Sequence, residues 1–448
     1  MRFDFFRRQG TTSEPVAAER GERTEPMIET RVPAYQPPEP RGANGFVTYA
    51  LQLDAQKRVR GYRLAWRAAG GGPEAPDASA QSRALLSCVS RHLNSGKGSR
   101  LGRLVLFLDV TVDTLFQSEL QALPPESVVL CMGLDDLMDA DTRSMLLFLR
   151  EQGFGFMLCN AEALPHDPAL LEVITHFDVG SGDSDLVASV RNDRLPEQPR
   201  VQLIATRMNG WDNFDACAAR HVDVFVDGDH PPPPVEKGAA MLQPESMLIV
   251  RLMQMIQRNE DVRSIESALK RDAALTYRLL RHINSPAIGA GVEITSLRHA
   301  VAMLGYSPLY RWLSLLLATS NKTSSPFMMK KAIMRGRFVE LMGHGMLPSS
   351  EADNLFVVGM FSLVDQLLGI SMQEVFAKVQ LAESVQQAIL HREGVYAPFL
   401  ALVEACETGT DQAGRFAEAL FVSAEQVNAA HLSAMVWSHE VSAVEIGD

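Results

Sequence analysis

The chain has few cysteines, and none of them is spaced for a structural role. The five cysteines are widely separated and include no C-x-x-C, which excludes a disulfide framework and indicates free thiols in a reducing compartment. No strongly apolar run approaches the roughly 20 residues that cross a bilayer, because the longest lies around residues 313–318. The first ten residues, MRFDFFRRQG, lack the apolar stretch of a signal peptide. We therefore expect a soluble cytoplasmic protein.

The common signatures of catalysis and of polyanion binding are missing too. GKGS at residues 96–99 lacks the glycine that opens a phosphate loop, since that position is Arg91. The sequence contains no H-E-x-x-H, no paired-cysteine zinc motif and no G-x-S-x-G elbow. The 42 Lys and Arg against 54 Asp and Glu give a net charge of -12. That balance argues against whole-chain attraction to nucleic acid or anionic lipid.

What the chain does contain divides into four segments. Residues 1–44 hold seven basic residues, seven acidic residues and six prolines with little apolar content, which predicts a disordered tail. Residues 45–230 alternate short apolar runs with amphipathic stretches. Residues 231–240 carry four consecutive prolines, which form a stiff linker. Residues 241–448 show helical periodicity throughout.

The second segment predicts an α/β fold. Its apolar runs are FVTYALQL, YRLAW, LVLFLDV, VVLCM, FGFMLC, HFDV, VQLIAT and VDVFV. Continuous apolar strands separated by helices indicate a parallel sheet that is covered on both faces. About eight strands in this length fit a β/α barrel better than an open sheet, which remains the alternative.

Charge is unevenly spread over the helical half. Residues 258–337 hold 13 Lys and Arg against five Asp and Glu, whereas residues 340–448 hold three against 15. One interpretation is a basic nucleic-acid surface beside aromatic residues. We favour surface pairing between the two segments, because nothing in them matches a groove-reading or base-stacking motif.

The helical half resembles the HDOD domain, a regulatory relative of HD-type metal phosphohydrolases. The resemblance lies in RDAALTYRLLRHINSPAIG (residues 271–289) and EITSLRHAVAMLGYSPLYRWLSLLL (residues 293–317). In that family the metal-binding His-Asp pair is typically gone, and no His-Asp occurs in this half. The resemblance implies a role in protein interaction during signalling.

A barrel followed by HDOD is similar to the bacterial EAL–HDOD family, whose EAL barrels hydrolyse cyclic di-GMP with two divalent ions held by carboxylates. The alignment puts Arg63 of YRLAW where that family has a metal-ligand glutamate. Cys131 of VVLCM stands at the second glutamate. Cys159 and Asn160 of FGFMLCNA stand at the paired aspartates.

The remaining matched positions are altered as well. Asp109 of FLDVT replaces an asparagine, and Asp178 of FDVG replaces the usual lysine. In VQLIATRMN, Thr206 and Asn209 replace the last two glutamates. Two divalent ions need clustered oxygen ligands, so the resemblance implies a degenerate EAL-type barrel with no catalytic, cofactor-binding or metal residues.

From these residues we expect a non-enzymatic signalling protein linked to cyclic di-GMP, which acts by contacting other signalling proteins. An alternative is a cyclic di-GMP receptor that binds without hydrolysis, with Arg63, Arg207 and Asn209 facing a phosphate. We expect no cofactor, no membrane insertion and no nucleic-acid partner, and a homodimer is left open. A zinc or redox pair of Cys131 and Cys159 is a weaker alternative, since strand-end cysteines are more often buried small hydrophobes.

Overall fold

The computed structural model describes most of the chain from Gly45 onward. Its described residues are 45–69, 77–95, 101, 104–138, 142–165, 167–192, 200–226, 244–270, 272, 275–279, 296, 298–299, 305–319, 325–379, 381–410 and 412–445. The predicted tail at 1–44, the linker at 231–240 and most of the HDOD motif residues from 271 to 304 lie outside this set.

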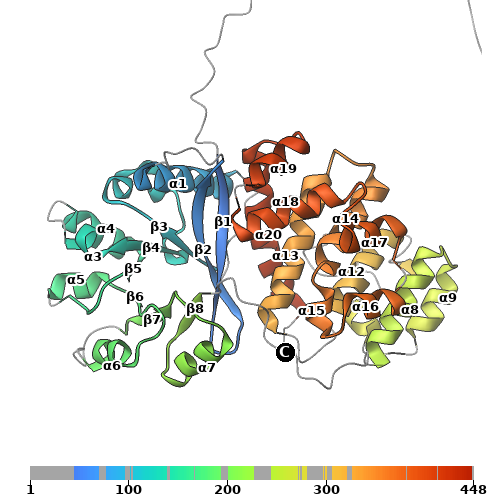
Figure 1. The fold of residues 1–448 in the computed structure, drawn as a ribbon, viewed down its shortest axis with the longest axis horizontal. Helices are drawn as coiled ribbons and strands as arrows, with labels where there is room; N and C mark the ends of the chain where they lie inside the picture. Colours follow the sequence, from blue (N-terminus) through green and yellow to red (C-terminus); the bar gives the residue numbers. More distant parts are fainter. Residues whose placement is uncertain are drawn as a thin grey trace, which may run out of the picture. The chain divides into compact units, whose positions relative to one another are not determined.

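The first part of the described chain is a closed eight-stranded barrel (Figure 1), as the apolar runs predicted. The strands are β1 (Gly45–Leu53), β2 (Val59–Ala68), β3 (Val105–Asp109), β4 (Val128–Gly133), β5 (Gly155–Cys159), β6 (His176–Asp178), β7 (Gln202–Ala205) and β8 (Val224–Val226). The connecting helices are α1 (Ala78–Asn94), α2 (Ser118–Gln121), α3 (Leu134–Met138), α4 (Arg143–Gln152), α5 (Pro168–Val173), α6 (Ser184–Asn192) and α7 (Trp211–Ala219), with 3₁₀ turns η1 (Val112–Phe116) and η2 (Pro125–Ser127).

One strand departs from the expected parallel sheet. β2 to β8 run parallel, but β1 is antiparallel to both of its neighbours, β2 and β8. The cause is the short connection after β1, because a turn of a few residues can join only antiparallel strands. Buried Asp54 holds this turn by accepting hydrogen bonds from the backbone N–H groups of Gln56 and Arg58, both at 2.9 Å.

Alternation along the strands separates two apolar layers. Residues such as Leu106, Leu108 and Phe156 point outward into the main core beneath the helices. The barrel interior is a second cluster, made of Phe107, Val129, Cys131, Met157, Cys159, Ile204, Val224 and Val226. The barrel is therefore a filled core rather than an open channel.

The second part of the described chain is helical, as the periodicity predicted. Its helices are α8 (Pro244–Gln257), α9 (Val262–Leu269), α12 (Tyr306–Thr319), α13 (Pro326–Gly343), α14 (Ser349–Phe361), α15 (Val364–Leu368), α16 (Met372–Lys378), α17 (Glu383–Leu390), α18 (Ala397–Thr408), α19 (Ala413–Ala419) and α20 (Ala424–Glu445). Helices α13 and α14 cross closely. A Cβ atom placed on Gly359 of α14 would lie only 2.7 Å from the Cα of Gly336 in α13.

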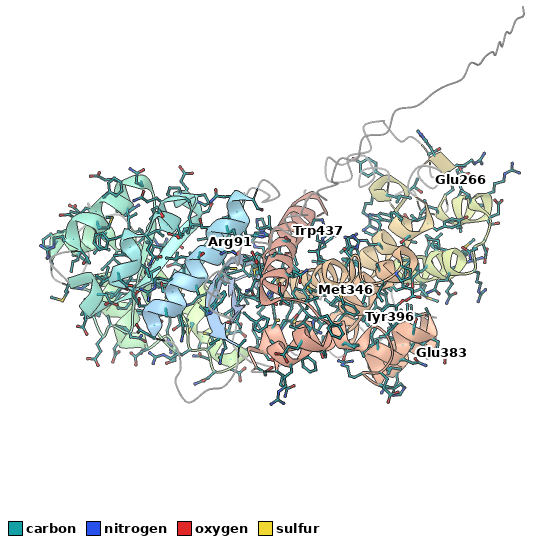
Figure 2. All side chains as sticks on the ribbon, turned by 90° about the horizontal axis from the view of Figure 1, so that it is seen from above. Arg91, Glu266, Met346, Glu383, Tyr396 and Trp437 are labelled. Atoms are coloured by element: carbon teal, nitrogen blue, oxygen red, sulfur yellow. The ribbon has the colours of Figure 1, made fainter. Side chains whose placement is uncertain are left out.

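The last helix, α20, packs against the first strand. β1 pairs with β8 only through Gln52 and Leu53. Nearer its start, Asn428 accepts a hydrogen bond from the Val47 N–H at 2.8 Å and donates one to the Gly45 carbonyl at 3.0 Å. A side-chain amide thus satisfies the strand's backbone groups in place of a neighbouring strand. Arg91 of α1, labelled in Figure 2, adds a surface ion pair to Glu425 at 2.7 Å.

A buried ion pair lies behind this contact. The guanidinium of Arg335 binds both carboxylate oxygens of Glu407, at 2.9 and 2.6 Å, and donates to Ser362 at 2.7 Å. Burial alone would raise the pKa of Glu407, but Arg335 outweighs that effect and holds it below its usual value. Arg335 and Glu407 therefore both stay charged in the folded protein, because each stabilises the charge of the other.

Candidate functional site at the barrel mouth

The barrel brings most of the sequence-predicted residues to one end. In a parallel barrel the carboxyl ends of the strands meet at the same face, which is where the βα loops form a site. Arg63 lies in β2, Asp109 ends β3 and Cys131 lies in β4, where it is the register partner of Asp109. Cys159 ends β5 and Asp178 ends β6. We call this end the mouth.

An ion pair lies at the mouth. The Arg63 guanidinium donates two hydrogen bonds to Oδ1 of Asp109, from Nη2 at 2.7 Å and from Nε at 3.2 Å. Burial would lower the pKa of Arg63, but the acidic groups of Cys131, Asp109 and Cys159 outweigh burial and raise it. The Arg63 side chain is 24% exposed and that of Asp109 is 49% exposed. A permanent cation and an accessible carboxylate thus face solvent together.

Sulfur atoms lie beneath this ion pair. Cys131 Sγ is 3.8 Å from Met157 Sδ, and Cys159 Sγ is 3.8 Å from the Met157 carbonyl oxygen. A hydrogen bond between the two thiols and burial both raise the pKa of Cys131 well above its usual value. All five cysteines of the chain are free thiols. The thiol of Cys131 is therefore protonated at neutral pH.

Asp178 and Thr206 are also brought together. Oδ1 of the buried Asp178 accepts hydrogen bonds from Thr206 Oγ1 at 2.6 Å and from the Gly180 N–H at 2.8 Å. Arg207 donates its backbone N–H to the Gly180 carbonyl at 3.0 Å, and its guanidinium lies against Cα of Gly180. Asp178 therefore ties the loops after β6 and β7 to each other.

Asn160 and Asn209 occupy the surface of the loops rather than this cluster. Asn160 is exposed and has a left-handed backbone with φ of 54°, a conformation that asparagine tolerates better than most residues. Asn209 is exposed and donates its backbone N–H to Oδ1 of Asn213 at 3.2 Å, at the start of α7.

Two side chains of the barrel interior escaped the sequence reasoning. Met157 has no neighbouring motif, and only the two-residue alternation in β5 places it on the same face as Cys159. His176 stacks edge-on against Phe107, with ring centroids 5.2 Å apart. Burial, and to a lesser extent the nearby Arg150, lowers the pKa of His176 to about 4, so this histidine is neutral.

The donor set does not fit the two divalent ions of EAL enzymes. Asp109 is engaged by Arg63, and Oδ1 of Asp178 is engaged by Thr206 and Gly180. In the part of the chain that the structure describes, no group of three or more His, Cys, Asp or Glu side chains is placed to hold a metal ion. We therefore assign no step at the mouth to such ions.

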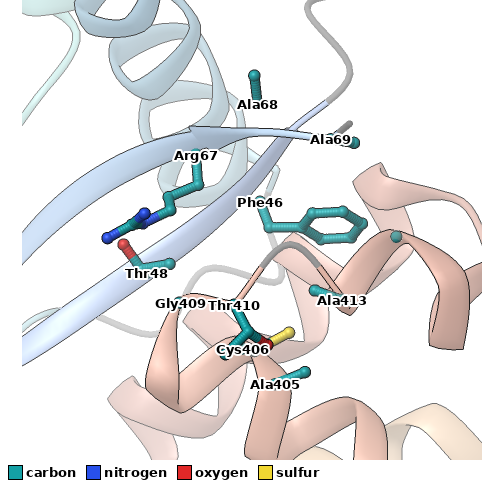
Figure 3. Close-up of a pocket in the computed structure, with 11 residues that line it drawn as sticks. Phe46, Thr48, Arg67, Ala68, Ala69, Ala405, Cys406, Gly409, Thr410 and Ala413 are labelled. Atoms are coloured by element: carbon teal, nitrogen blue, oxygen red, sulfur yellow. The ribbon is translucent and has the colours of Figure 1, made fainter. Parts of the chain in front are cut away.

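A separate hollow lies between the ends of β1 and β2 and helices α18 and α19 (Figure 3). Phe46, Thr48, Arg67, Cys406 and Thr410 line it together with alanine and glycine residues. Burial raises the pKa of the Cys406 thiol to about 12, so this cysteine is not a nucleophile. Because most of the lining is small and apolar, the hollow offers little for ligand recognition.

The sequence of the helical part matches a known domain. The model of the HDOD domain matches residues 242–372. This agrees with the motif residues quoted above. Among the residues described, no helix is long and apolar enough to cross a membrane.

Two curated relatives are similar in sequence. Cyclic di-GMP phosphodiesterase CdgJ of Vibrio cholerae is 26% identical over 416 residues, which cover 89% of this chain and 94% of CdgJ. The uncharacterized protein YuxH of Bacillus subtilis is 25% identical over 195 residues, covering 42% of this chain and 47% of YuxH.

Solved structures show weaker likeness. A cyclic di-GMP complex of the phosphodiesterase PaMucR is 12% identical with a TM-score of 0.33, covering 41% of this chain and 89% of PaMucR. BlrP1 of Klebsiella pneumoniae, in a manganese and cyclic di-GMP complex, is 18% identical with a TM-score of 0.33, covering 43% of this chain and 55% of BlrP1.

The full-length match to CdgJ contradicts the expectation of a non-enzymatic protein. That expectation rested on altered positions at the mouth, and the same mouth holds a carboxylate in Asp109 and a cation in Arg63 at hydrogen-bond distance. Altered ligands in an alignment therefore do not establish that activity is lost. By its folded elements and its matched sequence, the chain is a closed eight-stranded β/α barrel followed by a helical region that matches the HDOD domain.

Proposed function

We propose that this chain hydrolyses cyclic di-GMP as a phosphodiesterase, with the substrate bound at the barrel mouth. The observation that carries the proposal is the match to CdgJ, which extends over 94% of that phosphodiesterase. The match includes both the barrel and the HDOD domain, so the proposal concerns the chain as a whole.

The groups at the mouth have suitable chemistry for a phosphodiester. In our proposal the Arg63 guanidinium binds a phosphate oxygen of the substrate, because its planar donors suit phosphate geometry. Both of its bonds to Asp109 end on Oδ1. Oδ2 of Asp109 is then the atom that accepts a proton from the attacking water. The water oxygen bonds to phosphorus as the bond to the ribose leaving oxygen breaks, and solvent protonates that oxygen. Asp178 acts as a positioning residue through its bonds to Gly180 and Thr206.

The test is incubation of the full chain with cyclic di-GMP and chromatographic separation of the linear product. Reactions run in parallel with Mg²⁺, Mn²⁺, Ca²⁺ or a chelator, because the proposal specifies no ion. We expect cleavage by the unaltered chain and a loss of about 10²- to 10⁴-fold in Asp109→Asn, the range for removal of a general base.

Arg63→Gln, with Arg60→Gln as its matched control, tests the phosphate contact. Arg60 lies on the same strand but nearer its start, where it pairs with Asp54 at 3.1 Å. We expect Arg63→Gln to raise KM and Arg60→Gln to leave the kinetics unchanged. Absence of product under every ion condition, even with nucleotide bound, would contradict the proposed hydrolysis.

We further propose that the chain works in the cytoplasm and that other signalling proteins contact its helical part. The five free thiols support a reducing compartment. The partner proposal rests on the regulatory character that the HDOD resemblance implies. Co-purification of a defined regulator with the full chain, lost when the exposed residues of the helical part are altered, would support it.

A further inference from the structure

Three sulfur-containing side chains lie on the inward face of the barrel below the mouth. Cys131 and Met157 are register partners on adjacent strands β4 and β5, and Cys159 lies two residues beyond Met157 on the same inward face. These three side chains are 3%, 0% and 7% exposed in the order Cys131, Met157 and Cys159. Cys159, the most exposed of them, also ends its strand at the mouth.

The spacing of the Cys131 and Met157 sulfur atoms suits two ligands of one ion. Metal–sulfur bonds of about 2.3 Å place two ligands of a three-coordinate planar ion about 4.0 Å apart. Cys131 Sγ and Met157 Sδ are already 3.8 Å apart. The side chain of Cys159 is within hydrogen-bonding reach of Cys131. An ion could therefore bind with small rotations of the side chains and no movement of the strands.

The kinds of ligand select the kind of ion. Thiolate and thioether sulfur atoms are soft ligands that favour Cu(I). Zinc sites take cysteine, histidine or carboxylate ligands and are almost always four-coordinate, and no group of three such residues occurs in the described part of the barrel. A methionine between two cysteines distinguishes this cluster from a zinc site.

The surroundings balance the charge that such a site would carry. Two thiolates and one Cu(I) have a net charge of −1, and the Arg63 guanidinium beside both cysteines carries +1. The other interior neighbours are mainly apolar side chains, including Phe107 and Ile204, together with His176, the register partner of Met157. A bound ion would thus be shielded from water and from oxidation while its charge is offset.

We propose that Cys131, Met157 and Cys159 form a Cu(I)-binding site inside the barrel, beneath the Arg63–Asp109 ion pair. Binding replaces two thiol protons by one Cu(I), so about two protons are released per ion, and the thioether binds as a neutral ligand. The inference rests on the sulfur geometry and does not depend on the proposed hydrolysis of cyclic di-GMP.

Titration of the reduced full chain with Cu(I), in competition with a chromogenic Cu(I) chelator under anaerobic conditions, tests the site. We expect one equivalent of Cu(I) to bind, with about two protons released at neutral pH. X-ray absorption at the copper edge should show sulfur neighbours only, at about 2.3 Å.

Variants separate this site from the other cysteines. Cys131→Ala and Cys159→Ala should each weaken Cu(I) binding by at least about 100-fold, since even loss of an outer-shell partner costs 10- to 100-fold. Met157→Leu keeps the volume of the side chain and should reduce affinity and leave two sulfur neighbours. Cys217→Ala is the matched control, because Cys217 is equally buried but lies on α7 beside Ser181.

Three results would overturn the inference. They are no competition with the chelator, oxygen or nitrogen neighbours at the copper edge, and equal loss of binding in Cys217→Ala. Should an alanine variant unfold, Met157→Leu alone decides the outcome through the number of sulfur neighbours.

Discussion

At the scale of single residues, the protein keeps several ionisable groups in unusual states, and His431 is one of the most buried. Its Nδ1 lies 3.2 Å from the Val47 carbonyl oxygen, and its ring stacks edge-on against Tyr49 and Phe338. Burial lowers the pKa of His431 to about 4, although Glu407 and the Val47 carbonyl oppose that effect. The neutral ring therefore donates from Nδ1 to the strand.

Acid should destabilise the fold through this histidine. An unfolded histidine has a pKa near 6.5 and binds a proton below it, whereas folded His431 stays neutral down to about 4. The stability that it contributes is complete above pH 6.5 and is lost as the pH falls to about 4, by about 3 kcal/mol. Urea unfolding at pH 7.5, 6 and 5 measures this loss.

His431→Gln retains a donor to Val47 but does not titrate. We expect its free energy of unfolding to fall less steeply between pH 6.5 and 5 than that of the unaltered chain. His176 and His439 remain and have pKa values lowered to about 4, so part of the slope persists. Identical slopes in the two proteins would show that His431 is not the titrating group.

At the scale of elements, the crossing of α13 and α14 depends on two glycines. A Cβ on Gly359 would lie 2.8 Å from the Arg335 carbonyl oxygen, and one on Gly336 would lie 2.8 Å from the Phe356 carbonyl oxygen. Neither oxygen can move without disturbing its own helix. The two helices therefore meet at a distance that only glycine permits.

Gly359→Ala should lower the free energy of unfolding by about 1–3 kcal/mol, the usual range for overpacking a core. Gly414→Ala in α19 is the matched control, because its Cβ would meet Ala69 and Phe46 at 3.8 Å, an ordinary contact distance. That change should be neutral or stabilising by up to about 1 kcal/mol, since alanine favours the helix. Chemical denaturation compares the two, and equal effects would contradict the close crossing.

Sequence patterns predicted the elements better than their contacts. Eight apolar runs became eight strands, because a buried strand needs continuous apolar residues whatever lies beside it. The antiparallel pairing of β1 was missed, because an apolar run does not show whether its strand is parallel or antiparallel to its neighbours. Resemblance brought Arg63, Asp109, Cys131 and Cys159 to one mouth, yet Met157 stayed unnoticed because a lone methionine reads as core. The inference that altered metal-ligand positions mean absent activity was wrong. It assumed that each chemical group at the mouth could come only from the position that aligns with it in the family.

At the scale of the whole molecule, barrel and helices share one core. A single cluster of buried apolar residues runs from Phe46 in β1 to Val436 in α20. Asn428 links the two through backbone groups 381 and 383 residues away. No pattern within either half of the sequence specifies this bond, because it depends on the tertiary packing of both.

Asn428→Ala should therefore destabilise both halves together. It leaves the Val47 N–H and the Gly45 carbonyl buried without these partners, at a cost of about 1–3 kcal/mol for each group. Hydrogen exchange followed by mass spectrometry should show faster exchange in peptides of β1 and of α20 alike. Glu425→Ala, one turn earlier on α20, removes only a surface ion pair and should cost less than about 1 kcal/mol. Faster exchange confined to α20 would contradict the shared core.

The bond between Asn428 and β1 also has a consequence for synthesis of the protein on the ribosome. Val47 is made 381 residues before the side chain that covers it, a delay of about 20 to 80 s at ordinary bacterial and eukaryotic elongation rates. Throughout that interval the nascent barrel presents an uncovered strand edge, which can pair with another nascent chain on the same messenger. Chaperone binding to the nascent chain should therefore be greatest before α20 is translated. It should end once α20 has left the ribosome and covers β1.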